Sequence, residues 1–595
     1  MCLRAFLAAL ALAIADEAAG ASRPHIIMVL TDDLGWNTAW NNPDIHSPTL
    51  NSMAAAGVKL TSHYTYRFCS PSRAAFLTGR SPYKLLNIRE NMEPATVPEA
   101  TDERFTMLPK KLKEAGYYSY LIGKWHQGFR THSVTPVGRG FDESFGFLHG
   151  GEDHFTQVNE VCGWGKVTDY WQAGGEYGTG RPISDCNVPL SDRQPCPLFL
   201  AIRKNSSVDE ATKRCKAGHF ANCDYDKSES ENVDLHCFMC KPKRYTGYDF
   251  TNHAVKIIEE HSGKHPKEPM FMYLALHNTH GPIQAPDEFV ALYNYSLPKR
   301  NTFNAMVSVV DSTVANVTAA LKKAGLWDNC LFVWTTDNGT PVQVAGSNAP
   351  LRGTKGSGFE GGTRVPTFIS GGILPSSMSG KTLDGIVAFW DFFTTFCVLA
   401  GADPKEANPK SPTPVDGVDV WPYLSGQRPD SPRTEIVFDH LAFDRVATGA
   451  CFPGDEIVQV APCHGTGALR VGDYKLMVGV WGKAGHYGHF SPNETWSTDL
   501  EKLTLCSVET PCLFNVKDDM AEEHDLASSM PDKVAELMER FHAYDDEYHP
   551  PSAMPDDDAV NFCNVMLNNG GFSMPWQDVA AVSPMPSVVS ELEVV

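Results

Sequence analysis

The sequence has few basic residues for its acidic content, no internal repeat and, after its first residues, no long hydrophobic run. Its 595 residues include 50 Lys and Arg against 71 Asp and Glu, a formal net charge of −21. This charge disfavours nonspecific nucleic-acid binding, so we expect no nucleic-acid partner. The most apolar internal stretch, residues 386–400, contains Asp391 and is shorter than the roughly 20 residues of a membrane span. We therefore expect a core helix there and no membrane-spanning segment.

One further apolar run lies at the N-terminus. Arg4 precedes the run from Ala5 to Ala15, and both Ala13-Ile-Ala15 and Ala19-Gly-Ala21 fit the small-x-small cleavage rule. A run of this length is typical of a secretory signal peptide. We expect residues 1–21 to be that signal, and the mature protein to be secreted or to reside in a lysosome-like compartment of the secretory pathway.

Cysteine usage agrees with an oxidising compartment. Seven of the 16 cysteines cluster between residues 162 and 240. A zinc site is the alternative there, because the cluster includes a Cys-x-x-Cys pair, but two other clustered cysteines are eight residues apart and disulfides are favoured. The pairs Cys451–Cys463 and Cys506–Cys512 are spaced for local bridges. Cys330 and Cys397 lie in apolar segments, where we expect free, buried thiols.

Strands alternate with helices over residues 22–425, which predicts an α/β domain. Its architecture is a large mixed, mostly parallel sheet sandwiched by helices. Residues 155–245 interrupt the alternation and are interpreted as a Cys-rich insertion. The strands are expected at 25–31, 117–123, 270–276 and 330–336, and the helices at 48–56, 106–115, 249–261, 304–324 and 386–400.

A second, smaller α+β domain is expected over residues 430–577. The segment from 434 and the segment 467–478 alternate in polarity as antiparallel strands do, and residues 531–545 have a helical pattern. Residues 578–595 are rich in Ala, Val, Ser and Pro, and we expect a disordered tail.

Residues 69–80 carry the strongest functional signal. They read Cys-Ser-Pro-Ser-Arg-Ala-Ala-Phe-Leu-Thr-Gly-Arg. They resemble the signature of the type I sulfatases, C-x-P-S-R-x-x-x-L-T-G-R, at every fixed position. The resemblance implies that a formylglycine-generating enzyme oxidises Cys69 to an aldehyde, whose hydrate attacks sulfur with one hydroxyl and expels sulfate with the other. Without this context, Cys69 would be a buried or disulfide-bonded residue.

Two polar pairs follow apolar runs that are typical of buried parallel strands. Asp32 and Asp33 end the run 25–33, and Asp337 and Asn338 end the run 331–339. Such pairs are common in turns, but ligand sites of α/β sheets lie at the carboxyl ends of strands. Clustered carboxylates attract a hard cation such as calcium. The resemblance to sulfatases assigns these four residues and the matured Cys69 to one calcium ion.

Three further segments resemble the family and supply basic residues. Leu-Ile-Gly-Lys-Trp-His contains Lys124 and His126, His-Asn-Thr-His-Gly-Pro contains His280, and the Gly-rich segment Leu-Arg-Gly-Thr-Lys contains Lys355. Alone, each would be a solvated charge or a structural histidine. His277, three residues before His280, is an alternative to it.

The resemblance implies a division of labour among these residues. Arg73, Lys124, Lys355 and the calcium ion supply fixed positive charge for the sulfate oxygens. His280 is expected to give the leaving alkoxide or phenoxide a proton, with Lys355 as the alternative acid. His126 is expected to be the base that releases sulfate.

The segment 141–154 and the motif spacing look most like the arylsulfatase B group, the N-acetylgalactosamine-4-sulfatases. This resemblance implies a sulfated carbohydrate as substrate, with an aryl sulfate as the alternative. The insertion and the lack of cysteine between residues 81 and 130 depart from that group. Two other functions are weighed: a phosphodiesterase or phosphonate hydrolase of the alkaline phosphatase superfamily, and a non-catalytic glycan-binding relative. The single-metal residue set argues against the first, and the intact Cys69 and Arg73 argue against the second.

Sequons for N-glycosylation are also present. They begin at Asn205, Asn294, Asn316 and Asn493, and Asn338-Gly-Thr fits the pattern as well. We expect Asn338 to stay unmodified, because a metal ligand at a strand end cannot carry a glycan.

Overall fold

The computed structural model describes most of the chain, including the segments in which site residues are predicted. The described residues are 23–85, 100–160, 166–175, 178, 181–182, 245–341, 344–440, 467–481, 504–507, 509–547, 573, 575 and 577. The expected signal peptide, the cysteine cluster at 162–240, the Cys451–Cys463 bridge, the sequons at Asn205 and Asn493 and the tail at 578–595 lie outside these residues.

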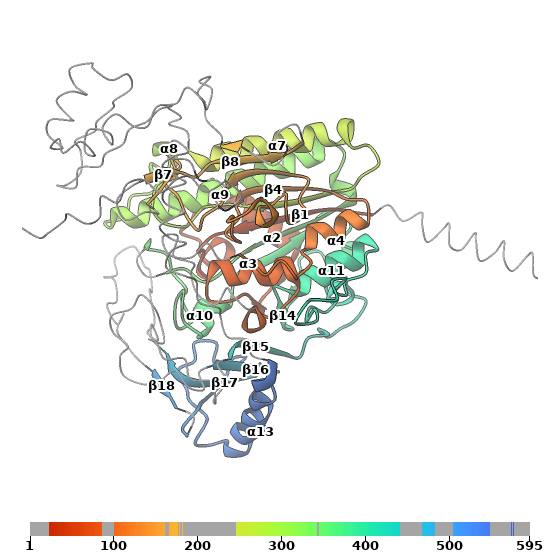
Figure 1. Cartoon of the computed structure of the whole chain (residues 1–595). Helices are drawn as coiled ribbons and strands as arrows, with labels where there is room; N and C mark the ends of the chain where they lie inside the picture. The colour runs from red at the N-terminus through yellow and green to blue at the C-terminus, as the bar shows by residue number, and fades with distance from the viewer. Residues whose placement is uncertain are drawn as a thin grey trace, which may run out of the picture.

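A ten-stranded sheet forms the centre of the molecule (Figure 1). Its five middle strands run parallel in the order β11-β1-β10-β4-β5, and antiparallel strands join both sides of this group. The mixed, mostly parallel α/β sheet predicted from the sequence is thereby confirmed. The strands are β13 (Thr382–Leu383), β2 (Val58–Leu60), β12 (Thr367–Ser370), β11 (Cys330–Thr336), β1 (His25–Thr31), β10 (Met270–Ala275), β4 (Tyr118–Lys124), β5 (Glu143–Phe147), β8 (Trp171–Gly174) and β9 (Arg181–Pro182).

Helices cover both faces of this sheet, because alternate residues of each buried strand point to opposite sides. In β1, Ile26 and Met28 belong to one core and Ile27 and Val29 to the other, and all four are fully buried. The first core includes α3 (Cys69–Thr78), α4 (Leu108–Glu114) and α11 (Asp391–Ala400); the second includes α2 (Pro48–Ala56), α7 (Thr246–Lys264) and α9 (Pro298–Lys323).

One predicted helix begins later than expected. Residues 386–400 do not form one helix: Val387–Ala388 is the short strand β14, parallel to β3 (His63–Tyr64), and α11 starts at Asp391. The Asp391 carboxylate accepts the backbone N–H of Ala388 at 2.8 Å. A carboxylate in the first turn of a helix accepts a backbone N–H that would otherwise be unpaired, and the positive end of the helix dipole stabilises its charge. This explains why the apolar run splits at Asp391 into a strand and a helix.

The expected insertion begins as part of the main sheet. β8 pairs antiparallel with β5, and β9 pairs with β8, so these two strands extend the parallel centre. They protect β5 from being an open edge, which sheets commonly avoid. The hairpin of β6 (Val158–Glu160) and β7 (Lys166–Thr168) precedes them.

A smaller antiparallel sheet follows, in the order β15-β16-β17-β18 with β19 also beside β17. Figure 1 shows it at one end of the molecule with α13 (Pro531–His542) against it. Leu537 and Phe541 of α13 pack on this sheet. The antiparallel strands and the helix predicted there are confirmed. The strands are β15 (Glu435–His440), β16 (Gly467–Val471), β17 (Tyr474–Trp481), β18 (Thr504–Cys506) and β19 (Cys512–Asn515).

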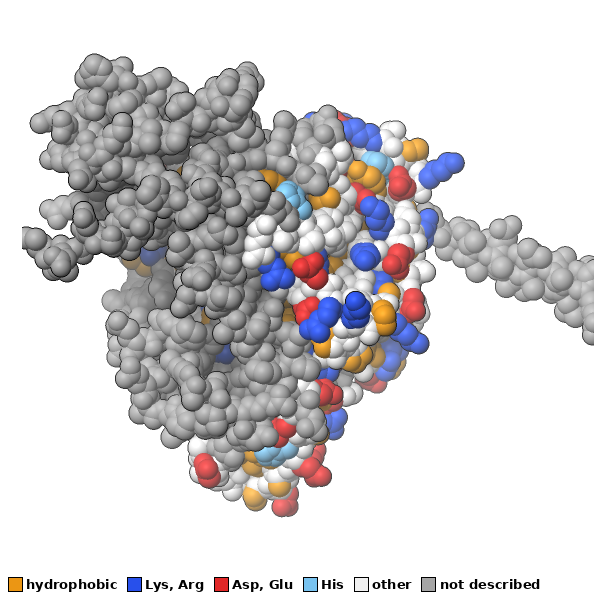
Figure 2. Space-filling view, viewed as in Figure 1, with side chains coloured by type: hydrophobic (Ala, Val, Ile, Leu, Met, Phe, Trp, Pro, Cys, Tyr) orange, Lys and Arg blue, Asp and Glu red, His pale blue; other side chains and the backbone are white. Residues whose placement is uncertain are grey.

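The described cysteines behave as predicted. Cys506 and Cys512 form a disulfide that joins the ends of β18 and β19. Cys330 in β11 and Cys397 in α11 are free and buried. Within the described part of the chain, helices of sufficient length and hydrophobicity to span a bilayer are not found. On the face shown in Figure 2, described basic and acidic side chains are interspersed rather than gathered by sign.

Candidate active site

Polar side chains gather where the central strands end. Asp32 and Asp33 directly follow β1, Asp337 and Asn338 directly follow β11, and Lys124 is the last residue of β4. Because β1, β11 and β4 belong to one parallel group, their carboxyl ends lie at the same edge of the sheet. Asp33 adopts a positive φ of 59°, a conformation that is uncommon outside glycine and is often found at functional sites.

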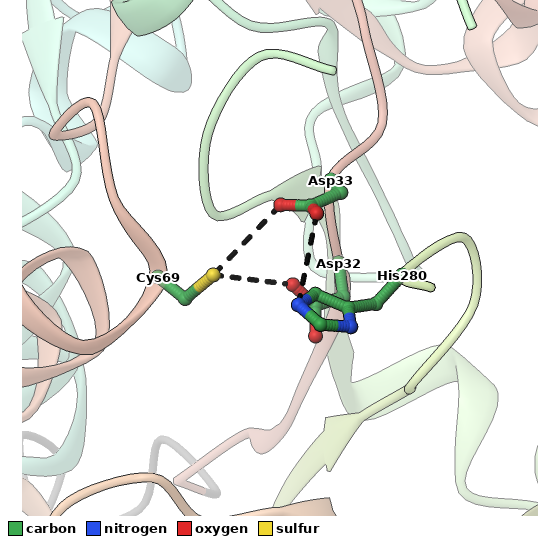
Figure 3. Close-up of side chains that lie close together, drawn as sticks. All are labelled: Asp32, Asp33, Cys69 and His280. Carbon is green, nitrogen blue, oxygen red and sulfur yellow. Dashed lines mark hydrogen bonds and ion pairs between the residues drawn. The ribbon is translucent and has the colours of Figure 1, made fainter. Parts of the chain in front are cut away.

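Cys69 enters this edge from α3. It is the first residue of the helix, and every residue of α3 is buried. The Cys69 Sγ lies 3.5 Å from Oδ1 of Asp32 and 3.8 Å from Oδ1 of Asp33. Figure 3 shows the side chain pointing across the site to both carboxylates, with the His280 ring beside them. The predicted nucleophile and the predicted metal ligands therefore lie together.

Each buried carboxylate has a cationic partner. These partners come from α3, from the end of β4 and from the loop after β11, so segments far apart in the sequence neutralise one another. An isolated charge at this depth would be strongly unfavourable. The pairs are Lys124 Nζ with Asp32 at 2.6 Å, Lys355 Nζ with Asp33 at 2.7 Å, and Arg73 Nη2 with Asp337 at 2.8 Å.

A metal ion fits the oxygen-rich side of this cluster. Asp32, Asp33, Cys69 and His280 each place a possible ligand atom within 4.8 Å of the others. The Asn338 Oδ1 is buried and accepts no hydrogen bond from the described residues, and Asn338 Nδ2 donates to Asp33 at 2.7 Å. A buried carbonyl oxygen without a donor beside two carboxylates is what a hard divalent cation requires.

Asp337 is placed differently from the other predicted ligands. Its Oδ2 accepts two hydrogen bonds from Arg73, at 2.8 and 3.0 Å, and its Oδ1 accepts the backbone N–H of Asp33 at 3.2 Å. Asp337 thus borders the compact ligand group and ties it to the guanidinium of Arg73. His280 belongs to the compact group, although the sequence analysis gave it a proton-transfer role rather than a ligand role.

Burial and the neighbouring charges together shift the pKa values of the acidic groups at the site, upward for Asp337 and Cys69 and downward for Asp33. Burial raises the pKa of Asp337 to about 6, with a further rise from Asp32 and an opposing effect from Arg73. Burial also opposes ionisation of Asp33, but Lys355 and its neighbours outweigh it and lower the pKa of Asp33. Burial and the carboxylate of Asp337 raise the pKa of the Cys69 thiol above its ordinary value. An unmodified Cys69 is a neutral thiol here, which is a poor nucleophile.

Two histidines flank the cluster. His126 follows β4 with a positive φ of 52°, and neither of its ring nitrogens has a hydrogen-bond partner among the described residues. A Cβ at Gly150 would lie 2.7 Å from Nε2 of His126, so a larger residue there would displace the ring from its present position. His280 hydrogen-bonds through Nδ1 to the carbonyl of Gly281 at 2.7 Å, and its Nε2 lies 3.8 Å from Asp33.

Comparison with known proteins decides the family. The family model described as Sulfatase matches residues 24–402, which is more than half of the chain. The chain belongs to the sulfatase family. Among relatives of this sulfatase, arylsulfatase J of Mus musculus is 29% identical over 568 residues, covering 94% of the chain and 81% of the relative. N-acetylgalactosamine-6-sulfatase of Mus musculus is 27% identical over 574 residues, covering 93% and 91%.

A solved structure agrees in fold. The crystal structure of Ps i-CgsB aligns with a TM-score of 0.62 and 25% identity, covering 91% of this chain and 97% of that one. The family match and the names of these relatives show that the protein is a sulfuric ester hydrolase. The family resemblance read from residues 69–80 is confirmed.

Some contacts at the site were not predicted from the sequence, although His277 was named there as an alternative to His280. Gly150 and Gly151 lie against the rings of His126 and His280, and His277 stacks beside His280. The double glycine after β5 was a usable signal, because adjacent glycines near catalytic residues often mark a close approach of backbone. The contact of His277 depends on tertiary packing and has no local signal.

Proposed function

We propose that the chain hydrolyses sulfate monoesters of sugars through formylglycine at position 69, with one calcium ion. The observation that carries this proposal is the position of Cys69 Sγ within 3.8 Å of two carboxylates at the start of a helix whose sequence is the sulfatase signature. The Sγ atom marks where the hydroxyls of the hydrated aldehyde would lie. Oxidation by a formylglycine-generating enzyme replaces a thiol that is neutral in this environment.

Calcium would be held by Asp32, Asp33, Asn338 and the matured residue 69, with Asp337 at the border. When bound, it would supply positive charge for the sulfate oxygens as a Lewis acid. The negative charges of the three carboxylates and the positive charges of the three basic side chains cancel, so the site is close to neutral without a metal. A divalent cation would make it positive, which suits an anionic ester.

The remaining residues divide by position. Arg73 and Lys124 are fully buried and Lys355 nearly so, so these fixed cations can hold sulfate oxygens without the cost of reorganising water. His280 donates through Nδ1 to a carbonyl, so in its imidazolium form it would give the second proton, on Nε2, to the leaving oxygen. His126, with both ring nitrogens free of hydrogen bonds to the described residues, would accept the proton whose loss expels sulfate.

Sugar sulfates are the proposed substrate class. Several relatives carry the name N-acetylgalactosamine-6-sulfatase, and the segment 141–154 resembles the arylsulfatase B group. The proposed compartment is the secretory pathway, because the N-terminal run fits a signal peptide.

A substrate panel tests the function. Purified protein from a secretory host should release sulfate from sulfated galactosamine sugars and from 4-nitrophenyl sulfate, and Cys69→Ala should abolish both activities. Cys330→Ala is the matched control, because Cys330 is also a free, buried thiol but lies at the far end of β11. Faster hydrolysis of phosphate diesters or phosphonates than of any sulfate ester would support the phosphodiesterase alternative instead.

A further inference from the structure

Four aromatic rings stack in a column that ends at the catalytic cluster. Tyr245 stacks on His154 with ring centroids 5.3 Å apart and an interplanar angle of 12°. His154 stacks on His277 at 4.0 Å and 17°, and His277 faces His280 at 5.5 Å and 30°. The last ring is the one drawn beside Asp33 in Figure 3. The column therefore connects the start of α7 to the histidine proposed as the acid.

His277 contributes a ring face rather than hydrogen bonds. Its side chain is fully buried, and neither ring nitrogen has a hydrogen-bond partner in the described part of the chain. Phe147 and His277 form a T-shaped pair, with ring centroids 4.9 Å apart and an interplanar angle of 62°. Burial lowers the pKa of His277 well below its ordinary value, so the ring is neutral and stacks without charge repulsion. Aromatic pairs in such geometries contribute beyond their buried area.

The column is anchored at its other end. The Nε2 of His154 lies 3.0 Å from the backbone carbonyl of His280; because a carbonyl only accepts, His154 carries its proton on Nε2. The hydroxyl of Tyr245 donates to the carbonyl of Gln284 at 2.9 Å and accepts from Asn278 at 2.8 Å. His154 thus holds the backbone of His280 through a hydrogen bond and stacks on the ring of His277.

His280 is also enclosed at its edge. A Cβ at Gly151 would lie 3.0 Å from Cε1 of the His280 ring and 3.7 Å from Nε2 of His277. The backbone at Gly151 therefore closes against the ring edge while His277 covers one ring face. A tilt of the His280 ring out of its present plane would disturb its contact with His277.

We propose that His277 is a positioning residue for His280. Its ring face, backed by His154 and Tyr245, holds the imidazole of His280 so that Nε2 points at the leaving oxygen of the ester. This inference rests on the proposed role of His280 as the acid. Loss of the stack should matter, because a misplacement of about 1 Å in a catalytic group can cost roughly 10²-fold in rate.

Leaving-group dependence tests this inference. The measurement is kcat/KM for phenyl sulfate, whose phenoxide leaves poorly, and for 4-nitrophenyl sulfate, whose phenoxide leaves without much help. His277→Ala should lower the rate on phenyl sulfate about 10- to 100-fold more than on 4-nitrophenyl sulfate. His277→Phe retains a flat ring face and should keep most of the wild-type ratio between the two substrates. If His277→Ala does not fold, His277→Leu takes its place, because leucine fills the space without offering a flat ring face. We expect the same selective loss on phenyl sulfate for this variant.

A double mutant separates positioning from mere stability. In the His280→Ala background, His277→Ala should produce no further leaving-group effect, because the group it positions is gone. His277→Ala could instead lower kcat/KM equally on both substrates while His280→Ala lowers it selectively on phenyl sulfate. That result would overturn this inference and leave the proposed function intact. Equal losses in His280→Ala itself would overturn the acid assignment and this inference together. Absence of sulfate release by the wild-type protein would overturn the proposed function.

Discussion

Among single residues, the site depends on a balance between three buried carboxylates and three buried cations. Arg73 and Asp337 have side chains with no exposed surface and pair at 2.8 Å. Removing one partner of such a pair costs about 3–5 kcal/mol, because the other charge stays buried. An effect on metal binding must therefore be separated from an effect on folding.

Asp337→Asn tests the metal site. The amide keeps the shape of the side chain and an acceptor for Arg73, but it removes one negative charge beside the proposed calcium. We expect calcium content to fall and kcat/KM on 4-nitrophenyl sulfate to drop at least about 100-fold. Elemental analysis of purified protein gives the metal content.

Asp391→Asn is the matched control for this change. Asp391 is equally buried and pairs with Arg433, at the start of α11 and away from the cluster. It should lose stability of a similar size while retaining metal and activity. A full equivalent of calcium in Asp337→Asn would contradict the assignment of Asp337 to the metal site.

His126→Ala tests the base. If His126 accepts the proton that allows sulfate to leave, this variant should accumulate covalent sulfate at position 69, whichever ester supplies it. Mass spectrometry of the intact protein after one turnover detects the adduct. His280→Ala, which acts before the adduct forms, is the control and should trap none. Multiple turnovers by His126→Ala at the wild-type rate would show that another group is the base.

The clustering of the proposed ligand and cation residues could be predicted from the sequence because they follow recognisable strands and motifs. Asp32 and Asp33 end an apolar run, and Cys69 and Arg73 share one signature. His277 entered the sequence analysis only as an alternative to His280. Its stacking contacts could not be predicted, because its partner His154 is distant in the sequence and meets it only after β5 and β10 pair with β4.

Among the elements, α3 carries the proposed nucleophile at one end and a constrained glycine at the other. Gly79 closes the helix with φ of 70°, and a Cβ there would lie 2.6 Å from the ring of Phe393. The position of Cys69 therefore depends on the packing of α3 against α11. Glycine is required at Gly79 both for its backbone conformation and for the space beside it.

Gly79→Ala should be more destabilising than Gly401→Ala. Gly401 ends α11 with φ of 75° and has nothing within 4 Å of a built Cβ, so its substitution costs only the backbone strain, about 1–2 kcal/mol. Gly79→Ala adds a clash with Phe393, for a total of about 2–5 kcal/mol. Urea unfolding measures both. Equal losses would mean that Phe393 moves aside freely.

The positions of most helices and strands could be predicted, since their periodicity is clear; the predicted helix 48–56, for example, is α2. The prediction of a single helix over residues 386–400 was wrong, because the apolar run continues from a strand into a helix. The boundary at Asp391 depends on Ser62 and Tyr64, whose carbonyls accept the backbone N–H groups of Val387 and Phe389. A local sequence window does not contain these partners.

Across the whole molecule, a buried charge network joins the small sheet to the loop that carries Lys355. Lys475 in β17 pairs with Glu360 at 3.0 Å and with Glu522 at 2.9 Å. Glu522 also accepts the backbone N–H of Glu360 at 2.7 Å, and its carbonyl accepts from Arg352 at 2.9 Å. The C-terminal part of the chain thus holds both ends of the segment 352–360.

This network predicts how stability depends on pH. Burial, with an opposing effect from Lys475 and a further rise from Glu360, raises the pKa of Glu522 to about 7 from an ordinary 4.5. The folded state therefore binds the proton more tightly than the unfolded state. The stability from Glu522 is fully present below about pH 4.5 and is lost as pH rises through 7, by up to about 1.4 kcal/mol per pH unit.

Thermal unfolding at several pH values checks this expectation. Glu522→Gln should flatten the fall in Tm between pH 5 and 7, because it cannot ionise. Glu360 acts in the opposite sense: burial opposes its ionisation, but Lys475 and Arg364 lower its pKa to about 2, so its contribution is lost at acid pH. A Tm profile unchanged by Glu522→Gln would contradict the coupling. The sequence did not reveal this network, because Lys475 and Glu522 lie far from the signature and have no motif.

The most direct test of the central claim is the chemical state of residue 69 in active protein. Mass spectrometry of the peptide that contains position 69, from protein with full sulfatase activity, should find an aldehyde there. Cys330 and Cys397 are internal controls, since both are free and buried and should remain thiols. An unmodified thiol at position 69 in fully active protein would contradict the account.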